Sequence, residues 1–128
     1  MSIDWATDQA LFMEAGGQTV TGHNQAQADR YLHHIHEEVT ELWRDHGVDK
    51  VKALDGAVDT IVVCLGYLIS IGIDPRKAWD AVHAANMRKV VDGKLYRRED
   101  GQIGKPPGWY GPEEELKALV NSVELVHA

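Results

Sequence analysis

Five carboxylates occur at helical spacing in two neighbouring segments of the chain. Glu37, Glu38 and Glu41 fall on one side of a single helical turn, at about 100° per residue. Asp55 and Asp59 are four positions apart in the next segment and also share a helical face. Like charges this close destabilise a helix unless a cation lies between them. If the two segments pack as antiparallel helices, their acidic faces meet and form an oxygen-rich site suited to Mg²⁺ or Mn²⁺.

Two long helices are expected to position these carboxylates. Apolar residues recur at steps of three and four in residues 24–46, which predicts a helix with Asn24 as its N-cap and Gly47 at its end. Residues 49–70 predict a second helix, apolar nearly all round, as is typical of a helix buried on more than one side. An acidic run alone is more often a solvated face, but a carboxylate such as Asp59 within an apolar helix is expensive without a partner.

Three further helices and one irregular segment complete the expected fold. Residues 4–15 predict a short helix that Gly16 ends, and residues 74–90 a helix with Asp74 as N-cap and Pro75 in its first position. Turn signals fill residues 91–112, where a small hairpin is expected at 94–103, and a last helix is expected at 113–126. The prediction is one all-α domain, 1–128, with a four-helix-bundle-like part at about 24–90 and an irregular C-terminal arm at about 91–128.

The arm differs in charge from the rest of the chain. Residues 88–105 contain six basic residues against three acids, a local charge of +3, whereas the whole chain carries −7. Asn86 and Lys89 lie three apart on one helical face and are candidates for holding phosphate and sugar, with Arg98 and Lys105 as further candidates. The alternative is an exposed basic arm without a ligand. Trp109 is expected to fix the arm to the helices.

Composition limits the classes of partner. The chain has 128 residues and an acidic balance that disfavours a nucleic-acid backbone or an anionic membrane. No run of about 20 apolar residues and no signal peptide is apparent. The single cysteine, Cys64, indicates a reducing cytoplasm and is expected to lie in the core, as is Trp79. The excess apolar surface of residues 49–70 predicts a homodimer or homotetramer.

The order of the motifs resembles the MazG-like all-α nucleoside triphosphate pyrophosphohydrolases, including phosphoribosyl-ATP pyrophosphohydrolase-like proteins of bacteria and phages. The resemblance covers residues 28–112. Besides the acidic motifs it rests on six short segments: Gly72-Ile73-Asp74-Pro75, Trp79-Asp80-Ala81-Val82-His83, Asn86-Met87-Arg88-Lys89, Asp92-Gly93-Lys94, Arg98-Glu99-Asp100-Gly101 and Lys105-Pro106-Pro107-Gly108-Trp109.

The resemblance implies a Mg²⁺-dependent hydrolase, with Mn²⁺ as a substitute, that cleaves the α–β phosphoanhydride of a (deoxy)nucleoside triphosphate to the monophosphate and pyrophosphate. It implies Glu37 as the general base, with Glu37 as ligand in place of Glu38 as the alternative. Where the family usually has a carboxylate three residues before Asp59, this chain has Gly56, and Asp55 is expected to substitute. The implied metal ligands are Glu38, Glu41, Asp55 and Asp59.

Several alternatives stay open at this point. Phosphoribosyl-ATP pyrophosphohydrolase is a second enzymatic reading, and a non-catalytic helical interaction module is a reading of another class. The histidines His33, His34 and His36 could ligate zinc or nickel, but a position on the surface or at the site rim is favoured. Asp80 and His83 do not form the Glu-x-x-His motif of di-iron bundles, which ranks that class low.

Overall fold

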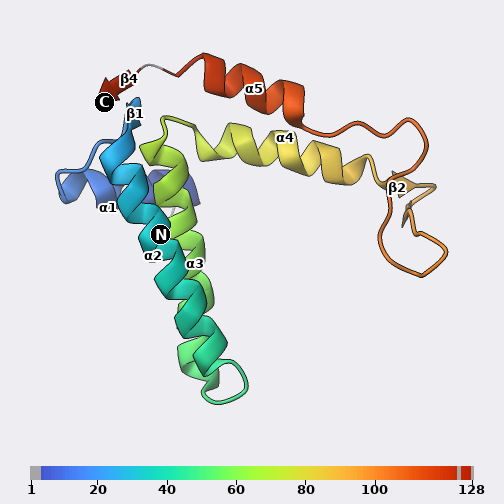
Figure 1. Cartoon of the computed structure of the whole chain (residues 1–128), viewed down its shortest axis with the longest axis horizontal. Coiled ribbons are helices and arrows are strands. Elements are labelled where there is room, and N and C mark those ends of the chain that lie inside the picture. Colours follow the sequence, from blue (N-terminus) through green and yellow to red (C-terminus); the bar gives the residue numbers. More distant parts are fainter. Residues whose placement is uncertain (1–3, 124, 128) are drawn as a thin grey trace. The chain divides into compact units, whose positions relative to one another are not determined.

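The structure, a computed structural model, describes residues 4–123 and 125–127 and is mostly helical. The predicted all-α class is therefore confirmed. The chain divides into two compact units, the first holding the described residues up to Pro75 and from Val123 onward, the second Arg76–Ser122. The elements in chain order are α1 (Trp5–Ala15), β1 (His23–Asn24), α2 (Gln25–Asp45), α3 (Lys50–Ser70), α4 (Pro75–Met87), β2 (Val90–Val91), β3 (Lys94–Leu95), α5 (Glu113–Asn121) and β4 (Leu125–His127) (Figure 1).

The helices of the first unit begin and end at the predicted residues. Asp4, Asn24 and Asp49 each accept a hydrogen bond from a backbone amide in the first turn of α1, α2 and α3, at 2.8 to 3.1 Å. These bonds satisfy amides that a helix cannot pair internally. Gly47 follows α2 with φ +77, a left-handed conformation that glycine adopts without strain. The predicted boundaries hold because they depend on local capping and turn chemistry.

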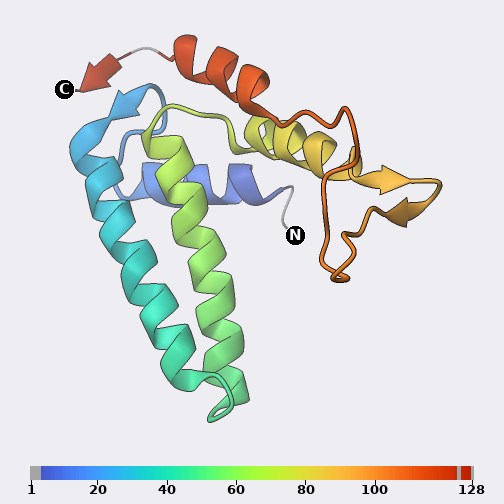
Figure 2. The same cartoon turned by 45° about the vertical axis from the view of Figure 1, so that its right-hand side comes forward.

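The helices α2 and α3 form an antiparallel hairpin in the first unit. They are joined by a short turn and lie side by side in both views (Figures 1 and 2). The core lies at one end of this hairpin, where Met13 of α1 packs with Tyr31 of α2 and Ile69 of α3. Gly66 makes this contact possible, because a Cβ there would lie 2.2 Å from the Tyr31 ring.

A buried polar network ties the same end together. The amide of Gln27 is buried and makes three hydrogen bonds. Its Nε2 donates to Ser70 Oγ at 2.9 Å and to the Thr19 carbonyl at 2.8 Å, and its Oε1 accepts from the Thr19 amide at 2.9 Å. The network links α2, α3 and the loop before β1, so the hairpin end is held by specific bonds as well as by packing.

Much of α3 is more exposed than its sequence predicts. The expectation that α3 is buried on more than one side is wrong for the single chain, since Leu54 and Ile61 are 67% and 52% exposed. Cys64 is exposed as well, so its predicted place in the core is also wrong. By length and composition α3 could cross a membrane, contrary to the expectation from sequence, although core helices of soluble proteins pass the same test. Periodicity records which face is apolar, but not what covers it.

The C-terminal residues return to the first unit. Strand β4 pairs in parallel with β1, with His23 opposite Leu125. Gly72 has φ +83, and a Cβ there would lie 2.6 Å from Val123 Cγ1, so only glycine fits at this position. The predicted last helix is therefore too long, because α5 ends at Asn121 and the residues beyond it pair over a long sequence distance.

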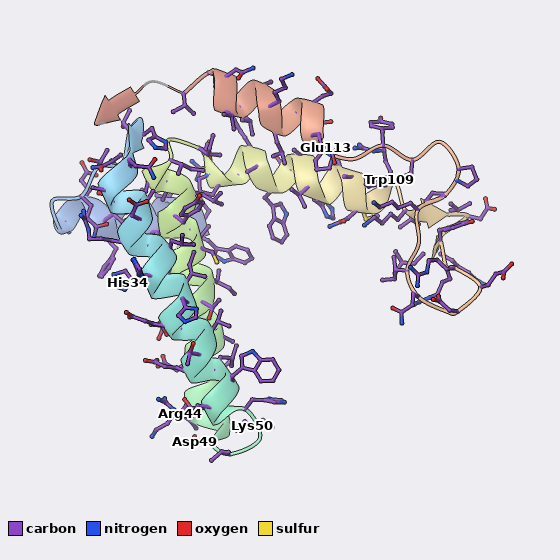
Figure 3. The ribbon with its side chains drawn as sticks, in the orientation of Figure 1. His34, Arg44, Asp49, Lys50, Trp109 and Glu113 are labelled. Carbon is purple, nitrogen blue, oxygen red and sulfur yellow. The ribbon has the colours of Figure 1, made fainter. Side chains whose placement is uncertain are left out.

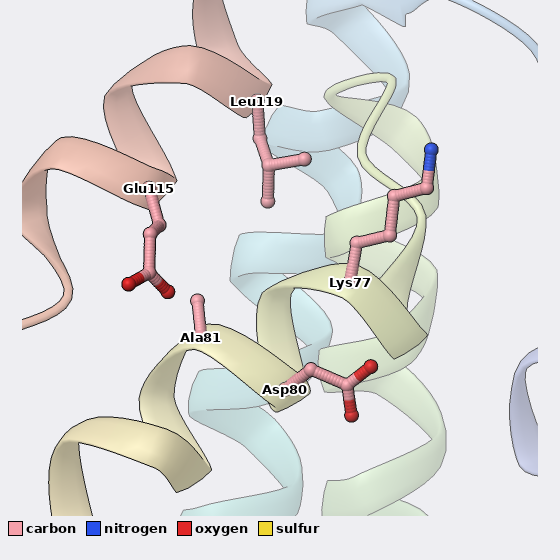
Figure 4. A pocket seen from close by; sticks show the side chains of 5 residues that line it. All are labelled: Lys77, Asp80, Ala81, Glu115 and Leu119. Atoms are coloured by element: carbon pink, nitrogen blue, oxygen red, sulfur yellow. The ribbon is translucent and has the colours of Figure 1, made fainter.

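The second unit holds its arm against α4. Trp109 Nε1 donates to the Ala85 carbonyl at 2.8 Å, which fixes the arm to α4 as expected, and Arg88 donates to the carbonyls of Tyr110 and Gly111 at 3.0 and 3.2 Å. A shallow hollow separates α4 from α5 (Figure 4). Trp79, expected in the core, is 63% exposed.

The strands of the arm differ in part from the prediction. The helix α4 ends at Met87, three residues before the expected end, because β2 and β3 form an antiparallel pair directly after it. Asp92 and Gly93, both with positive φ, make the turn between them, as in a type I′ hairpin. The hairpin expected at 94–103 is present only as a bridge between Arg97 and Ile103.

Candidate functional site

The five predicted carboxylates lie on one side of the α2–α3 hairpin. The helices approach closely there, because a Cβ at Gly56 would lie 3.6 Å from the Cα of Leu42. Gly56 thus faces α2 directly, and a long acidic side chain at this position would point at the α2 backbone. Asp55, one residue earlier, turns about 100° away, toward the side on which Asp59 lies. Position 56 therefore faces α2, whereas Asp55 lies on the side of the hairpin that carries Asp59.

Glu38 is at the centre of the carboxylates. Its pKa is raised, first by burial and then by the negative charges of Glu41, Asp59, Asp55 and Glu37. One side chain therefore senses all four other predicted residues. Its Oε2 atom is buried and has no hydrogen-bond partner. An unpartnered carboxylate oxygen among four further carboxylates is an arrangement that a bound cation stabilises.

The carboxylates are not gathered around a single point. Among the described residues, no three side chains of His, Cys, Asp and Glu stand close enough together to hold a metal ion as they are. Glu37, Glu41 and Asp55 are exposed and free to change rotamer. Glu37 turns to His34, with 3.6 Å between Oε2 and Nδ1 (Figure 3 labels His34). The donor set fits a hard divalent cation by its chemistry, since every candidate ligand atom is a carboxylate oxygen.

A hollow of about 320 Å³ adjoins the carboxylates in the same unit. It lies one helical turn further along both helices, because His34 precedes Glu38 by four residues and Val63 follows Asp59 by four. Val62 and Val63 give it an apolar lining on the α3 side. The positions of these residues therefore place an apolar recess directly beside the acidic cluster.

Amide and aromatic side chains line much of the rest of the hollow. Gln9 and Gln18 contribute amides, and Phe12 of α1 lines it with a largely exposed ring. Tyr31 donates its hydroxyl to Gln18 Oε1 at 2.6 Å, and burial raises the pKa of Tyr31, so the hydroxyl stays protonated. Arg30 adds a positive charge at the lining. Sequence reasoning missed this hollow, because its residues come from α1, a loop, α2 and α3 with no common spacing.

Three of the four predicted phosphate-binding residues come together in the second unit. Lys89 Nζ lies 5.3 Å and Lys105 Nζ 4.9 Å from the centre of the Trp109 ring. Asn86 Oδ1 accepts from Lys89 Nζ at 3.4 Å. Arg98 instead pairs with Asp100, its Nε lying 3.2 Å from Oδ1. Both ammonium groups contact the same aromatic ring, which concentrates positive charge in this part of the second unit.

The chain matches no family model, and no curated protein matches it either. Its fold and site define a helical protein with a carboxylate cluster on a helix hairpin, an adjoining hollow and a separate cationic pair.

Proposed function

We propose that the protein is a Mg²⁺-dependent pyrophosphohydrolase that converts a (deoxy)nucleoside triphosphate to the monophosphate and pyrophosphate. The observation that carries the proposal is the buried, unpartnered Oε2 atom of Glu38 among four other carboxylates. Mg²⁺ held by these carboxylates would polarise phosphoryl oxygens and lower the pKa of an attacking water. Mn²⁺ has similar ligand preferences and is expected to substitute.

The residues divide into ligands and a base. Glu38, Glu41, Asp55 and Asp59 are the proposed metal ligands, and the burial of Glu38 favours it over Glu37 in this role. Glu37 is exposed and lies 3.6 Å from the His34 imidazole, outside the proposed ligand set, so it is the proposed general base for the attacking water. Its carboxylate accepts the proton as the water oxygen attacks the α-phosphorus, the bond between the α-phosphorus and the bridging oxygen breaks, and the β- and γ-phosphates leave together as pyrophosphate.

The remaining groups suit the other parts of a nucleotide. The hollow beside the carboxylates has an apolar lining, an exposed aromatic ring and amide side chains, which suit a nucleobase. Lys89 and Lys105 of the second unit are proposed, from their chemistry alone, to bind phosphate oxygens. Removing unwanted nucleotides from a cytoplasmic pool is the role we propose for such an enzyme.

A panel of nucleotides tests the function. The full chain is incubated with each NTP and dNTP, and with phosphoribosyl-ATP, in Mg²⁺, in Mn²⁺ and in EDTA, and the products are resolved by ³¹P NMR. We expect monophosphate and pyrophosphate with divalent ions only. Selective turnover of phosphoribosyl-ATP would identify the alternative enzyme. Nucleoside diphosphate and inorganic phosphate as products would contradict α–β cleavage. No turnover of any nucleotide would favour the interaction module.

Site variants connect the activity to the carboxylates. Asp59→Asn and Glu41→Gln keep the shape of each side chain and remove one charge, so turnover is expected to fall at least about 100-fold. Glu114→Gln on α5 is the matched control, since this carboxylate is exposed and lies outside the cluster. Full activity in both site variants would show that the proposed site is wrong even if the protein is a hydrolase.

A further inference from the structure

The apolar groups of the hollow in the first unit suit a flat ring of any kind. Phe12, Val62 and Val63 line the hollow with aromatic and aliphatic surface. Stacking and aliphatic contact attract every nucleobase, because every base has a π-face. The choice among bases therefore depends on the polar atoms of the lining and on whether each of them donates or accepts a hydrogen bond.

Two of the amides that line the hollow are committed to protein partners. Gln27 is 2% exposed, and its amide donates to Ser70 Oγ and to the Thr19 carbonyl and accepts from the Thr19 amide. Gln9 is 6% exposed and hydrogen-bonds the Tyr31 hydroxyl. Both amides are buried, and they hold the walls of the hollow in place.

The amide of Gln18 is oriented so that it offers a donor. The Tyr31 hydroxyl donates to Gln18 Oε1 at 2.6 Å. Burial raises the pKa of Tyr31, and hydrogen bonds with Gln18 and then Gln9 oppose this rise without cancelling it, so the phenol keeps its proton. A phenol has only one proton, and here Gln18 Oε1 accepts it, so the Gln9 amide donates to the same oxygen. The Nε2 group of Gln18 is thereby left to donate.

Arg30 adds further donors from α2. Its side chain lines the hollow, and its positive charge opposes the effect of burial on the pKa of Tyr31, so it lies near the hydroxyl that holds Gln18. A guanidinium has five N–H donors and no acceptor. His34 also lines the hollow, but its Nδ1 lies 3.6 Å from Glu37 Oε2. The groups that Gln18 and Arg30 offer to a ligand are therefore both donors.

We propose that Gln18 and Arg30 make the hollow select bases that carry a carbonyl group where other bases carry an amino group. The inference rests on the proposed function, which places a nucleobase in the hollow. The carbonyl oxygen of guanine, hypoxanthine, thymine or uracil accepts from the two donors, whereas the amino group of adenine or cytosine brings a donor against them. Specificity then comes from rejecting the amino bases as well as from binding the oxo bases. The preferred substrates include the triphosphates that deamination of adenine and cytosine produces.

Two pairs of substrates isolate the group that is selected. ITP and ATP, like dUTP and dCTP, differ only in the exchange of an amino group for a carbonyl and in the accompanying ring proton. For the full chain in Mg²⁺, kcat/KM is expected to be about 10- to 100-fold higher for the oxo member of each pair, because an amino group leaves donors unpaired. Equal values within both pairs, or a preference for ATP and dCTP, would overturn the inference and leave the proposed hydrolysis standing.

Variants of the two donors connect the preference to the hollow. Gln18→Glu keeps the side-chain shape and an oxygen for the Tyr31 hydroxyl, but it replaces the donor by an acceptor, so both oxo-to-amino ratios are expected to fall at least about tenfold. Arg30→Gln is expected to lower the ratios as well. Asn121→Asp is the matched control, since it makes the same change from amide to acid at an exposed position on α5, and it should keep the wild-type ratios. A preference that survives in both Gln18→Glu and Arg30→Gln would show that these residues do not select the base.

Binding without catalysis separates this inference from the proposed function. Inosine and adenosine are titrated into the ¹⁵N-labelled full chain in EDTA, and the Nε2 signal of Gln18 is identified by its loss in Gln18→Glu. The signal is expected to shift with inosine and to stay almost unchanged with adenosine at the same concentration. This result in a chain that hydrolyses no nucleotide would support the selectivity of the hollow and contradict the proposed function. A shift that is no larger with inosine than with adenosine would overturn the inference.

Discussion

Glu38→Gln is expected to stabilise the protein in the absence of a divalent cation. The substitution keeps the side-chain shape and removes a charge. Burial first, and then repulsion by the neighbouring carboxylates, raises the pKa of Glu38. A like-charge pair three residues apart on a helix, such as Glu38 with Glu41, costs about 0.2–0.5 kcal/mol. The burial of Oε2 and the charges of Asp55 and Asp59 on α3 add to this, so the total is on the order of 1 kcal/mol. For a chain of 128 residues this raises the midpoint of thermal unfolding by about 4 °C.

The effect depends on pH with a definite sign. Because the pKa of Glu38 is raised, the folded protein holds this proton more tightly than the unfolded chain. Wild-type stability therefore falls as the pH rises from the usual glutamate value of about 4.3 through the raised native value, and the full penalty is present above it. The Gln variant lacks this titration, so its advantage is expected at neutral pH and should vanish in acid.

Addition of Mg²⁺ is expected to make the wild type more stable than the Glu38→Gln variant. A ligand at 100 times its dissociation constant stabilises the folded state by about 2.7 kcal/mol, which corresponds to about 10 °C for a domain of this size. The wild type should show this shift, whereas the Glu38→Gln variant should lose most of it. Differential scanning calorimetry in EDTA and in a Mg²⁺ series measures both effects, with Glu114→Gln as the control. A Glu38→Gln variant that is less stable in EDTA, or that keeps the full Mg²⁺ shift, would refute the reasoning.

Three further predictions concern packing and charge. Gly66→Ala is expected to lower the free energy of unfolding by about 1–3 kcal/mol in urea titrations, since the added methyl meets the Tyr31 ring, and an unchanged midpoint would contradict the packing. Gln27→Leu is expected to cost about 2–3 kcal/mol, because it leaves the partners of a buried amide unpaired, Ser70 Oγ among them, and hydrogen exchange should speed up at this end of the hairpin. Lys105→Ala is expected to raise the KM for the nucleotide about tenfold while kcat changes less, and a loss in kcat alone would argue against phosphate binding.

Local chemistry explains what the sequence predicts well. Asn24 and Asp49 accept hydrogen bonds from the first turns of α2 and α3, and both residues are recognisable as caps without any tertiary information. The meeting of Glu38 with Asp59 follows from helical spacing and a short connection, which make the hairpin antiparallel. The acidic side of the hairpin is thus a consequence of sequence periodicity.

Long-range contacts explain what the sequence does not predict. Gln9 and Gln18 line the hollow from different elements, and neither carries a spacing signal that links it to α3. Strand β4 pairs with β1, far away in the sequence, at the positions where the sequence predicts the end of the last helix. Arg98 lies in the basic arm as expected, yet its charge is taken up by Asp100 two residues away. These outcomes depend on which side chains meet, and composition and periodicity do not specify that.

The exposure of Ile61 and Cys64 is a different kind of disagreement. The sequence predicts burial for both, and the predicted helix is present with its apolar residues at the expected spacing, but the single chain leaves them in water. An apolar pattern is shaped by burial in the state in which the protein works, so it records contacts with a partner as well as contacts within the chain. The homodimer or homotetramer predicted from residues 49–70 stays a prediction, and it is the state in which the expected burial of Ile61 and Cys64 would apply.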